Sequence, residues 1–342
     1  MSLVIAVAPL GAQERPASPF DRLDRNGDGR LTQDELPPAL RGNFSRVSAN
    51  NDGSISREED SAFRRRTAAA GRQEGGPRVP ENVRAVRDIP YAGTDHPRQQ
   101  LDLYLPVAPS RERPPLLVFI HGGGWRNGSK AGGAAQVMPY VAGGEFAGAS
   151  IGYRLTDIAS WPAQIHDCKA AIRWLRAHAE EYGYDPDRIG IMGTSAGGHL
   201  VAMLGTSGDV AAVEGDLGEH TGVSSRVACV VDFFGPANML TMGDGESRID
   251  HDAPDSPESK LLGGPAKQNP DVAREASPIT HVSADDPPFL ILHGTEDPLV
   301  PFSQSAAFHQ ALRNAGVNST LLTIQGGGHG GFNTPEVNER VR

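Results

Sequence analysis

The chain has 342 residues and a formal net charge of −10, which argues against the basic face that a nucleic-acid groove requires. Hydrophobic residues make up 38% of the chain and charged residues 22%, so a sizeable core can form, and the length suits one large domain with a small one. The sequence has no run of about 18 apolar residues, the length that a membrane span needs. We therefore expect neither a nucleic-acid nor a membrane partner.

The first residues, 1–12, combine a short apolar run from Leu3 to Leu10 with the small residues Gly11 and Ala12. This pattern resembles a signal peptide that lacks its positively charged beginning. An apolar tail is the alternative interpretation. We interpret the segment as a signal-peptide remnant, which predicts a secreted or periplasmic protein.

Residues 13–64 contain an internal repeat with a shift of 24 residues. The first copy, "DRNGDGRLTQDE" at 24–35, resembles an EF-hand loop, because oxygen donors fall at loop positions one, three, five and twelve and a glycine at six. The resemblance implies a calcium site with side-chain ligands from Asp24, Asn26, Asp28 and Glu35 and a carbonyl ligand from Arg30.

The second copy, "SANNDGSISREE" at 48–59, has serine in place of the first aspartate. It implies a weaker calcium site, whose ligands would be Ser48, Asn50, Asp52, Ser54 and Glu59. A polar turn is the alternative for either loop. We expect the bound calcium to stabilise the fold of residues 13–64. Docking of this segment to a protein partner is the alternative.

Residues 65–82 are rich in Ala, Gly, Arg and Pro and are interpreted as a linker. From residue 83 to 342, apolar strand-like runs alternate with helical stretches, which favours a mostly parallel central sheet with helices on both faces. A pair of strands within 83–105 is expected to form an antiparallel edge. The other predicted strands are 116–121, 146–153, 188–193, 227–234, 288–293 and 319–325, and the predicted helices are 163–180, 196–206 and 303–315.

The two cysteines, Cys168 and Cys229, fall in apolar surroundings of a predicted helix and a predicted strand. They are too few for a disulfide scaffold, and no CxxC metal pattern is present. We interpret both as small core residues, with a disulfide between them as the alternative.

The pentapeptide Gly193-Thr194-Ser195-Ala196-Gly197 has the form G-x-S-x-G. It follows a predicted buried strand and opens a predicted helix, as a nucleophile elbow requires. A serine nucleophile needs a histidine base, and the histidine needs an orienting carboxylate. Asp297, just past another predicted strand, is the predicted acid, with Glu296 as the fallback. His329, among glycines after the last strand, is the predicted base.

The stretch "IHGGGWRNGS" at 120–129 places three glycines after a buried strand. Attack on an ester carbonyl creates an oxyanion, which backbone N–H groups must face. Gly123, Gly124 and Ala196 are the predicted oxyanion-hole donors. Trp125, Tyr153 and Trp161 are candidates for lining the acyl or sugar pocket, with core packing as the alternative for each.

The motifs "HGGGW", "GTSAGG", "HGTEDPLVP" and "GGGHGGF", in that order, resemble the α/β-hydrolase superfamily, and its feruloyl and acetylxylan esterase branch in particular. The resemblance covers roughly 83–342 and implies a serine carboxylesterase that needs no cofactor for catalysis. Residues 83–115, which precede the glycine motif, are expected to form strands and turns and not a helical cap. The polar, Pro-rich insertion at 236–284 is expected to form a modest rim over the site. Both features favour short-acyl or carbohydrate-linked acetyl and feruloyl esters over emulsified lipid.

Two other functions stay open at this stage. The same three catalytic residues could serve an amidase or a peptidase, because the glycine motif indicates acyl transfer without distinguishing an ester from an amide. A calcium-dependent binding or scaffold protein with an inactive hydrolase domain is the alternative from another class.

Overall fold

The computed structural model describes residues 20, 23–36, 44, 48, 52–60, 79–208, 210–332 and 334–342. Contacts between Cα atoms divide the chain into two units, residues 1–75 and 76–342. The predicted signal-peptide remnant at 1–12, most of the predicted linker at 65–82 and the predicted ligand Asn50 lie outside the described residues.

The N-terminal unit is built around a two-stranded antiparallel sheet of β1 (Arg30–Leu31) and β2 (Ile55–Ser56). Leu31 pairs with Ile55, so position eight of the first loop lies against position eight of the second. A small apolar core of Phe20, Leu31, Leu36 and Ile55 holds the two loops together.

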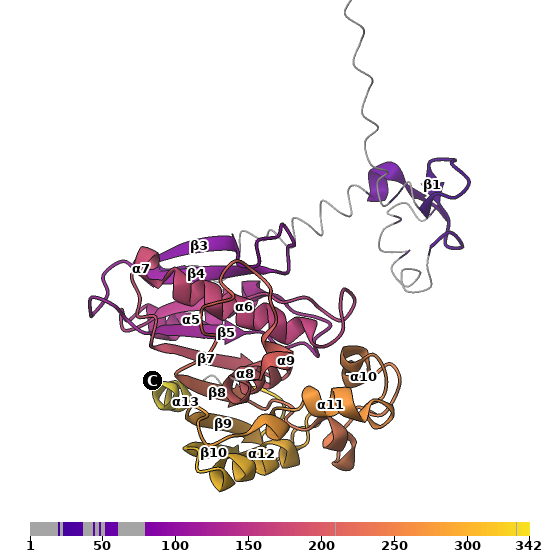
Figure 1. Ribbon diagram of the computed structural model, residues 1–342. Coiled ribbons are helices and arrows are strands. Elements are labelled where there is room, and N and C mark those ends of the chain that lie inside the picture. The colour runs from indigo at the N-terminus through magenta and orange to yellow at the C-terminus, as the bar shows by residue number, and fades with distance from the viewer. Residues whose placement is uncertain are drawn as a thin grey trace, which may run out of the picture. The chain divides into compact units, whose positions relative to one another are not determined.

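The C-terminal unit has an eight-stranded sheet in the order β10-β9-β8-β7-β5-β6-β4-β3 (Figure 1). Neighbouring strands from β6 through β5 to β10 pair in parallel, whereas β3 and β4 form the expected antiparallel edge. The strands are β3 (Val83–Pro90), β4 (Gln100–Pro106), β5 (Leu116–Ile120), β6 (Ala147–Ile151), β7 (Ile189–Thr194), β8 (Cys229–Phe233), β9 (Phe289–Gly294) and β10 (Ser319–Ile324).

Side chains of the central strand β5 alternate between two cores, because successive residues of a strand point to opposite faces. Leu116, Val118 and Ile120 join the larger core, and Leu117 and Phe119 join the smaller one. Residues of α6 (Ala163–Ala177), α8 (Ala196–Thr206) and α12 (Phe302–Asn314) line the larger core, and residues of α5 (Gly133–Val141) and α13 (Pro335–Val341) line the smaller one. The predicted mostly parallel sheet with helices on both faces is confirmed.

The strands predicted from the sequence agree with the structure to within about two residues at each end. Helix α8 has the predicted bounds, 196–206. Helix α5, at Gly133–Val141, was not predicted. Cys168 is fully buried, as expected, whereas Cys229 is exposed at the start of β8 and both thiols are free. The core interpretation of Cys229 is therefore wrong, since an apolar run does not show which strand end reaches the surface.

The insertion between β8 and β9 folds into short helical segments past one end of the sheet (Figure 1). Its elements are η2 (Met239–Asp244), α10 (Pro257–Leu262), η3 (Ala266–Gln268), α11 (Pro270–Glu275) and η4 (Pro278–His281). Throughout the described ranges, the helices are too short or too polar to cross a membrane.

Strand β7 meets helix α8 in a tight turn at Ser195, whose φ of 55° and ψ of −120° are unusual for a residue with a side chain. The turn brings α8 so close to β5 that a Cβ on Gly197 would collide with the carbonyl oxygen of Ile120. Every residue of α8 is buried, so neither partner can shift without disturbing packed neighbours.

We predict that Gly197→Ala lowers the free energy of unfolding by at least about 1–3 kcal/mol, the usual cost of overpacking a core. Urea denaturation followed by circular dichroism measures the change. Gly222→Ala is the matched control, because a Cβ there meets nothing within 4 Å. Equal midpoints for the two variants would contradict the close approach of strand and helix.

Candidate active site

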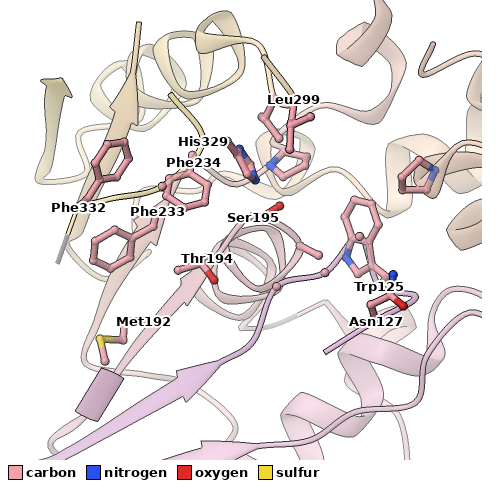
Figure 2. A pocket seen from close by; sticks show the side chains of 18 of the residues that line it. Trp125, Asn127, Met192, Thr194, Ser195, Phe233, Phe234, Leu299, His329 and Phe332 are labelled. Carbon is pink, nitrogen blue, oxygen red and sulfur yellow. The ribbon is translucent and has the colours of Figure 1, made fainter. Parts of the chain in front are cut away.

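A cavity of about 620 Å³ opens at the turn between β7 and α8. Ser195 lies in the middle of its lining, and His329 lines the same cavity (Figure 2). Ser195 is partly exposed, so its hydroxyl can reach a molecule in the cavity. The strained turn thus presents a hydroxyl to a concave site, as a nucleophile requires.

Asp297 holds the imidazole of His329 through a hydrogen bond of 2.7 Å between its Oδ2 and Nδ1 of the ring. The carboxylate side chain is fully buried, while the His329 side chain is 16% exposed. Burial raises the pKa of Asp297, but hydrogen bonds from His293, His329 and the amides of Val300 and Leu299 outweigh it and hold the pKa below its ordinary value. Asp297 therefore stays ionised, and Glu296 is not the partner.

The described residues include no hydrogen bond between the Ser195 hydroxyl and the His329 ring. Such contacts are frequently long in sites without a substrate. The Nδ1–Asp297 bond directs Nε2 of His329 away from the acid, so this nitrogen is the one free to accept a proton.

The loop after β5 approaches the nucleophile closely. Gly123 has a φ of +113°, and a Cβ there would collide with the carbonyl oxygen of Asn127, so this position requires glycine. The backbone amides of Gly123, Gly124 and Ala196 donate to none of the described residues, and all three residues line the cavity. The structure thus brings the predicted donors to the predicted nucleophile.

The first calcium-like loop, in the N-terminal unit, is closed by its own backbone amides. The carboxylate of Asp24 accepts hydrogen bonds from the amides of Gly27 and Gly29, each at 2.9 Å. Glu35 accepts from the amides of Thr32 and Arg25, and the hydrogen bonds from Thr32 lower its pKa. In the part of the chain that the structure describes, no three His, Cys, Asp or Glu side chains gather closely enough to hold a metal ion.

In the second loop, Asp52 forms an ion pair with Arg30 of the first loop, with Nη1 and Oδ2 3.1 Å apart. The same guanidinium donates to the hydroxyl of Ser54 at 2.9 Å. Ser48 is buried, and its hydroxyl oxygen has no hydrogen-bond partner among the described residues. A cation in the second loop would therefore compete with the charge of Arg30.

Comparison with known proteins places these features in families. The family model BD-FAE matches residues 101–312, which is more than half of the chain. The chain belongs to the BD-FAE family. A model of the EF hand matches residues 19–36, which contain the first loop.

Named relatives of this BD-FAE protein are ester hydrolases. "Probable carboxylic ester hydrolase LipM" of Mycobacterium tuberculosis is 33% identical over 79% of this chain and 65% of its own length. "Esterase LipC" of the same organism is 33% identical over 69% of this chain and 58% of its own length. The chain thus spans about 58–65% of these curated relatives.

Solved structures similar to the BD-FAE unit are also esterases. A truncated carbohydrate esterase from gut microbiota has a TM-score of 0.69 and 34% identity, over 75% of this chain and 93% of its own. A propionate-bound thermophilic esterase of Thermogutta terrifontis has a TM-score of 0.60 and 30% identity, over 77% and 93%. The fold and the family are therefore those of carboxylic-ester hydrolases.

His293, near the end of β9, is a second imidazole beside the carboxylate of Asp297 in the BD-FAE unit. Its Nε2 lies 3.0 Å from the carbonyl oxygen of Val300 and 3.3 Å from Oδ2 of Asp297. Its Nδ1 lies 2.7 Å from the hydroxyl of Ser305. The position of His293 at the end of a predicted strand favours a structural hydrogen-bonding role, and these contacts agree with it. The H-G-x-x-D spacing of residues 293–297 was the available signal.

His199 connects three elements around the nucleophile. Its Nδ1 accepts a hydrogen bond of 3.2 Å from the indole N–H of Trp125, and its Nε2 lies 2.7 Å from the carbonyl oxygen of Ala276. Burial lowers the pKa of His199 to about 4, so the neutral ring donates from Nε2 to Ala276. Trp125, at a φ of 55°, is thereby tied to α8 and to the insertion.

The two walls of the cavity differ in character. Figure 2 shows Phe233, Phe332 and Met192 on one side of Ser195 and Trp125 and Asn127 on the other. The first wall was missed in the sequence, although Phe233 closes a strand whose carboxyl end faces the site, which is where ligands bind in such sheets. The insertion adds Ile249, His251, Pro257 and Glu258 to the lining.

Two of the three candidate pocket residues lie outside the cavity lining and pack in the core, which was the alternative for each. Tyr153 is fully buried, is absent from the cavity lining, and donates a hydrogen bond of 2.9 Å to the carbonyl oxygen of His121, whose ring it stacks on at 4.3 Å. Trp161 also packs outside the cavity, where its indole N–H donates to Glu275 at 2.9 Å. Trp125 lines the cavity although it is only 1% exposed.

We predict that His199→Phe lowers kcat/KM for a short ester about 10-fold or more. The substitution keeps a ring but leaves the buried indole N–H of Trp125 and the carbonyl of Ala276 without partners, which costs about 1–3 kcal/mol for each group. Steady-state kinetics and a thermal melt measure the two effects separately. His178→Phe is the control, because His178 directly follows α6 and stacks on Trp174 outside the cavity. A kcat/KM within twofold of wild type for His199→Phe would contradict the positioning role.

Proposed function

We propose that this protein is a serine carboxylesterase that hydrolyses short-acyl or carbohydrate-linked esters through an acyl-enzyme. The observation that carries the proposal is the 2.7 Å hydrogen bond from the buried carboxylate of Asp297 to His329, whose ring lines the same cavity as Ser195. The esterase relatives and the esterase structures support it.

In the first half of the reaction, the hydroxyl oxygen of Ser195 attacks the ester carbonyl and its proton passes to Nε2 of His329. Asp297 stabilises the resulting imidazolium and keeps the ring in place. Amides of Gly123, Gly124 and Ala196 receive the oxyanion, and each such donor typically contributes about 3–4 kcal/mol to transition-state stabilisation.

Acylation ends when the tetrahedral intermediate collapses, the C–O bond to the alcohol breaks, and His329 returns the proton to the departing alkoxide. In the second half, water attacks the acyl-enzyme while its proton passes to Nε2 of His329. Collapse of the second tetrahedral intermediate breaks the bond to the Ser195 oxygen, which takes that proton back as the carboxylic acid leaves. The chain's own residues supply every group that these steps need.

The lining of the cavity favours an apolar acyl group. A cavity of about 620 Å³ falls within the range of small-molecule sites. Aromatic side chains form one wall, since Phe234 lies 4.5 Å from the ring of His329 and 5.3 Å from the ring of Phe332, centroid to centroid. This wall suits an apolar acyl group next to the nucleophile.

We predict that Ser195→Ala lowers kcat for p-nitrophenyl acetate by at least about 10³-fold, because the nucleophile is removed. Release of p-nitrophenolate measures the rate. Ser160→Ala, at an exposed serine outside the cavity, is the control. Equal rates for wild type and Ser195→Ala would reject the proposal. Rates of the wild type on a matched ester and amide distinguish an esterase from an amidase.

We further propose that the first loop of the N-terminal unit binds calcium in a structural role. Asp24, Asn26, Asp28 and Glu35 supply the hard oxygen donors that calcium prefers, and the β1–β2 pairing fixes the loop. Glu35 would have to exchange its bonds to the amides of Thr32 and Arg25 for the ion. The pairing of Arg30 with Asp52 makes the second loop the weaker site.

We predict one calcium site of sub-millimolar Kd in the full chain, lost in Glu35→Gln because a bidentate carboxylate is replaced by a neutral amide. Isothermal titration calorimetry measures binding. Glu59→Gln, at the matching position of the second loop, is the control and is expected to retain the site. Absence of calcium binding by the wild type would reject the proposal, and loss of turnover in EDTA by a folded protein would reject the purely structural role.

A further inference from the structure

Asp232, the fourth residue of β8, is a buried carboxylate that takes no part in the reaction steps above. It is only 1% exposed, and its Oδ2 has no hydrogen-bond partner among the described residues. Burial raises the pKa of Asp232 to about 6, although the amide of Gly235 and the nearby His293 act in the opposite direction. A buried carboxylate with unused hydrogen-bonding capacity is costly, so its place in the central sheet calls for an explanation.

The other carboxylate oxygen closes the turn that follows β8. Oδ1 of Asp232 accepts a hydrogen bond of 2.8 Å from the amide of Gly235. The same oxygen lies in a space that two glycines leave open, because a Cβ on Gly198 or on Gly235 would collide with it. Gly198 belongs to the first turn of α8, where the positive end of the helix dipole favours a negative charge. The carboxylate is therefore fixed between α8 and this turn.

The turn holds Phe234 in an unfavourable backbone conformation. Its φ is 47°, in the left-handed region that residues with a side chain rarely adopt, and such a residue persists only where its surroundings fix it. The amide of Phe234 donates to the carbonyl oxygen of Leu292 on β9 at 2.8 Å, and the bond between Asp232 and Gly235 spans the turn. Only the second of these bonds comes from a side chain, so replacing Asp232 is the change that releases the turn.

Both aromatic residues of the turn contact the candidate site. The carbonyl oxygen of Phe233 accepts a hydrogen bond of 2.9 Å from the amide of Ser195. The ring of Phe234 packs on that of His329, with the centroids 4.5 Å apart and the planes tilted by 57° (Figure 2). The hydrogen bond from Asp297 fixes only Nδ1 of the imidazole. The imidazole can still swing about that atom, and the phenyl ring limits the swing on its side.

We propose that Asp232 is a positioning residue for the imidazole of His329. Its bond to Gly235 holds Phe234 against that ring, which keeps Nε2 available to Ser195. The inference rests on the proposed function and adds to it a residue that contacts no substrate, since Asp232 does not line the cavity. Without this bond the turn relaxes, the phenyl ring moves away from the imidazole, and the proton transfers of both half-reactions slow.

The first test compares Asp232→Ala with Asp232→Asn in the hydrolysis of p-nitrophenyl acetate. The alanine variant loses the bond to Gly235, and we expect its kcat to fall by about 10-fold or more with KM within about twofold of wild type, because a small displacement of a reacting group is costly in rate. The asparagine variant keeps a carbonyl oxygen for the same amide, so its kcat is expected to stay within about threefold of wild type.

Asp102→Ala is the control for destabilisation alone, because it removes a buried carboxylate of β4 that lies outside the cavity. It is expected to lower the melting temperature and to leave kcat within about twofold of wild type. An alanine variant at Asp232 that keeps its kcat within about threefold of wild type overturns the positioning role, and so does an asparagine variant whose kcat falls further than that.

A double-mutant cycle tests the route through Phe234. Residues that act through one another have non-additive effects, so Asp232→Ala is expected to lower kcat by no more than about threefold in a Phe234→Leu background. A larger fall in that background overturns the role. Should Asp232→Ala fail to fold in a thermal melt, Phe234→Leu alone decides, because it removes the ring contact and keeps the carboxylate. A kcat within about threefold of wild type for Phe234→Leu then overturns the role.

Failure of the esterase proposal looks different, because wild type and Ser195→Ala then hydrolyse the ester equally. The positioning role is still tested by nuclear magnetic resonance, since the ring of Phe234 shifts the Cε1–H signal of His329, which His329→Gln identifies. We expect Asp232→Ala to move this signal towards its position in Phe234→Leu, and Asp232→Asn to leave it in place. An unmoved signal in Asp232→Ala overturns the role independently of the esterase proposal.

Discussion

The candidate site depends on one buried carboxylate that stays charged. Asp297 has a fully buried side chain, and burial alone would favour its neutral form. Two imidazoles and two backbone amides reverse that preference. If the carboxylate were neutral, it could not stabilise an imidazolium at His329, and Ser195 would keep its proton. The loop after β9 therefore combines a structural role with a chemical one.

The second constraint on the candidate site is the close approach of two backbone segments around Ser195. The β7–α8 turn presses Gly197 onto β5, and the glycine loop after β5 folds back towards the same turn. Side chains at these positions would separate the hydroxyl from the amides that we propose to receive the oxyanion. His199 ties the arrangement together, because one neutral ring accepts from Trp125 and donates to the insertion.

The insertion between β8 and β9 gives the site its particular character. The proposed nucleophile, acid and base follow strands of the central sheet, whereas Glu258 and His251 belong to the insertion. α10 packs on the glycine loop through Pro257, so the insertion holds this side of the cavity in place. Substrate choice can thus vary with the insertion while the reaction chemistry stays the same.

By itself the sequence determined the parallel sheet, the helix that follows Ser195 and the chain order of the candidate residues Ser195, Asp297 and His329, because apolar periodicity and glycine spacing are local properties. Only the tertiary structure decided that Tyr153 is buried against His121, that Cys229 reaches the surface, and that His251 meets Glu258 at the cavity wall. Those outcomes depend on which residues distant in the chain pack against each other, and burial at a strand end or in an irregular insertion leaves no periodic signal.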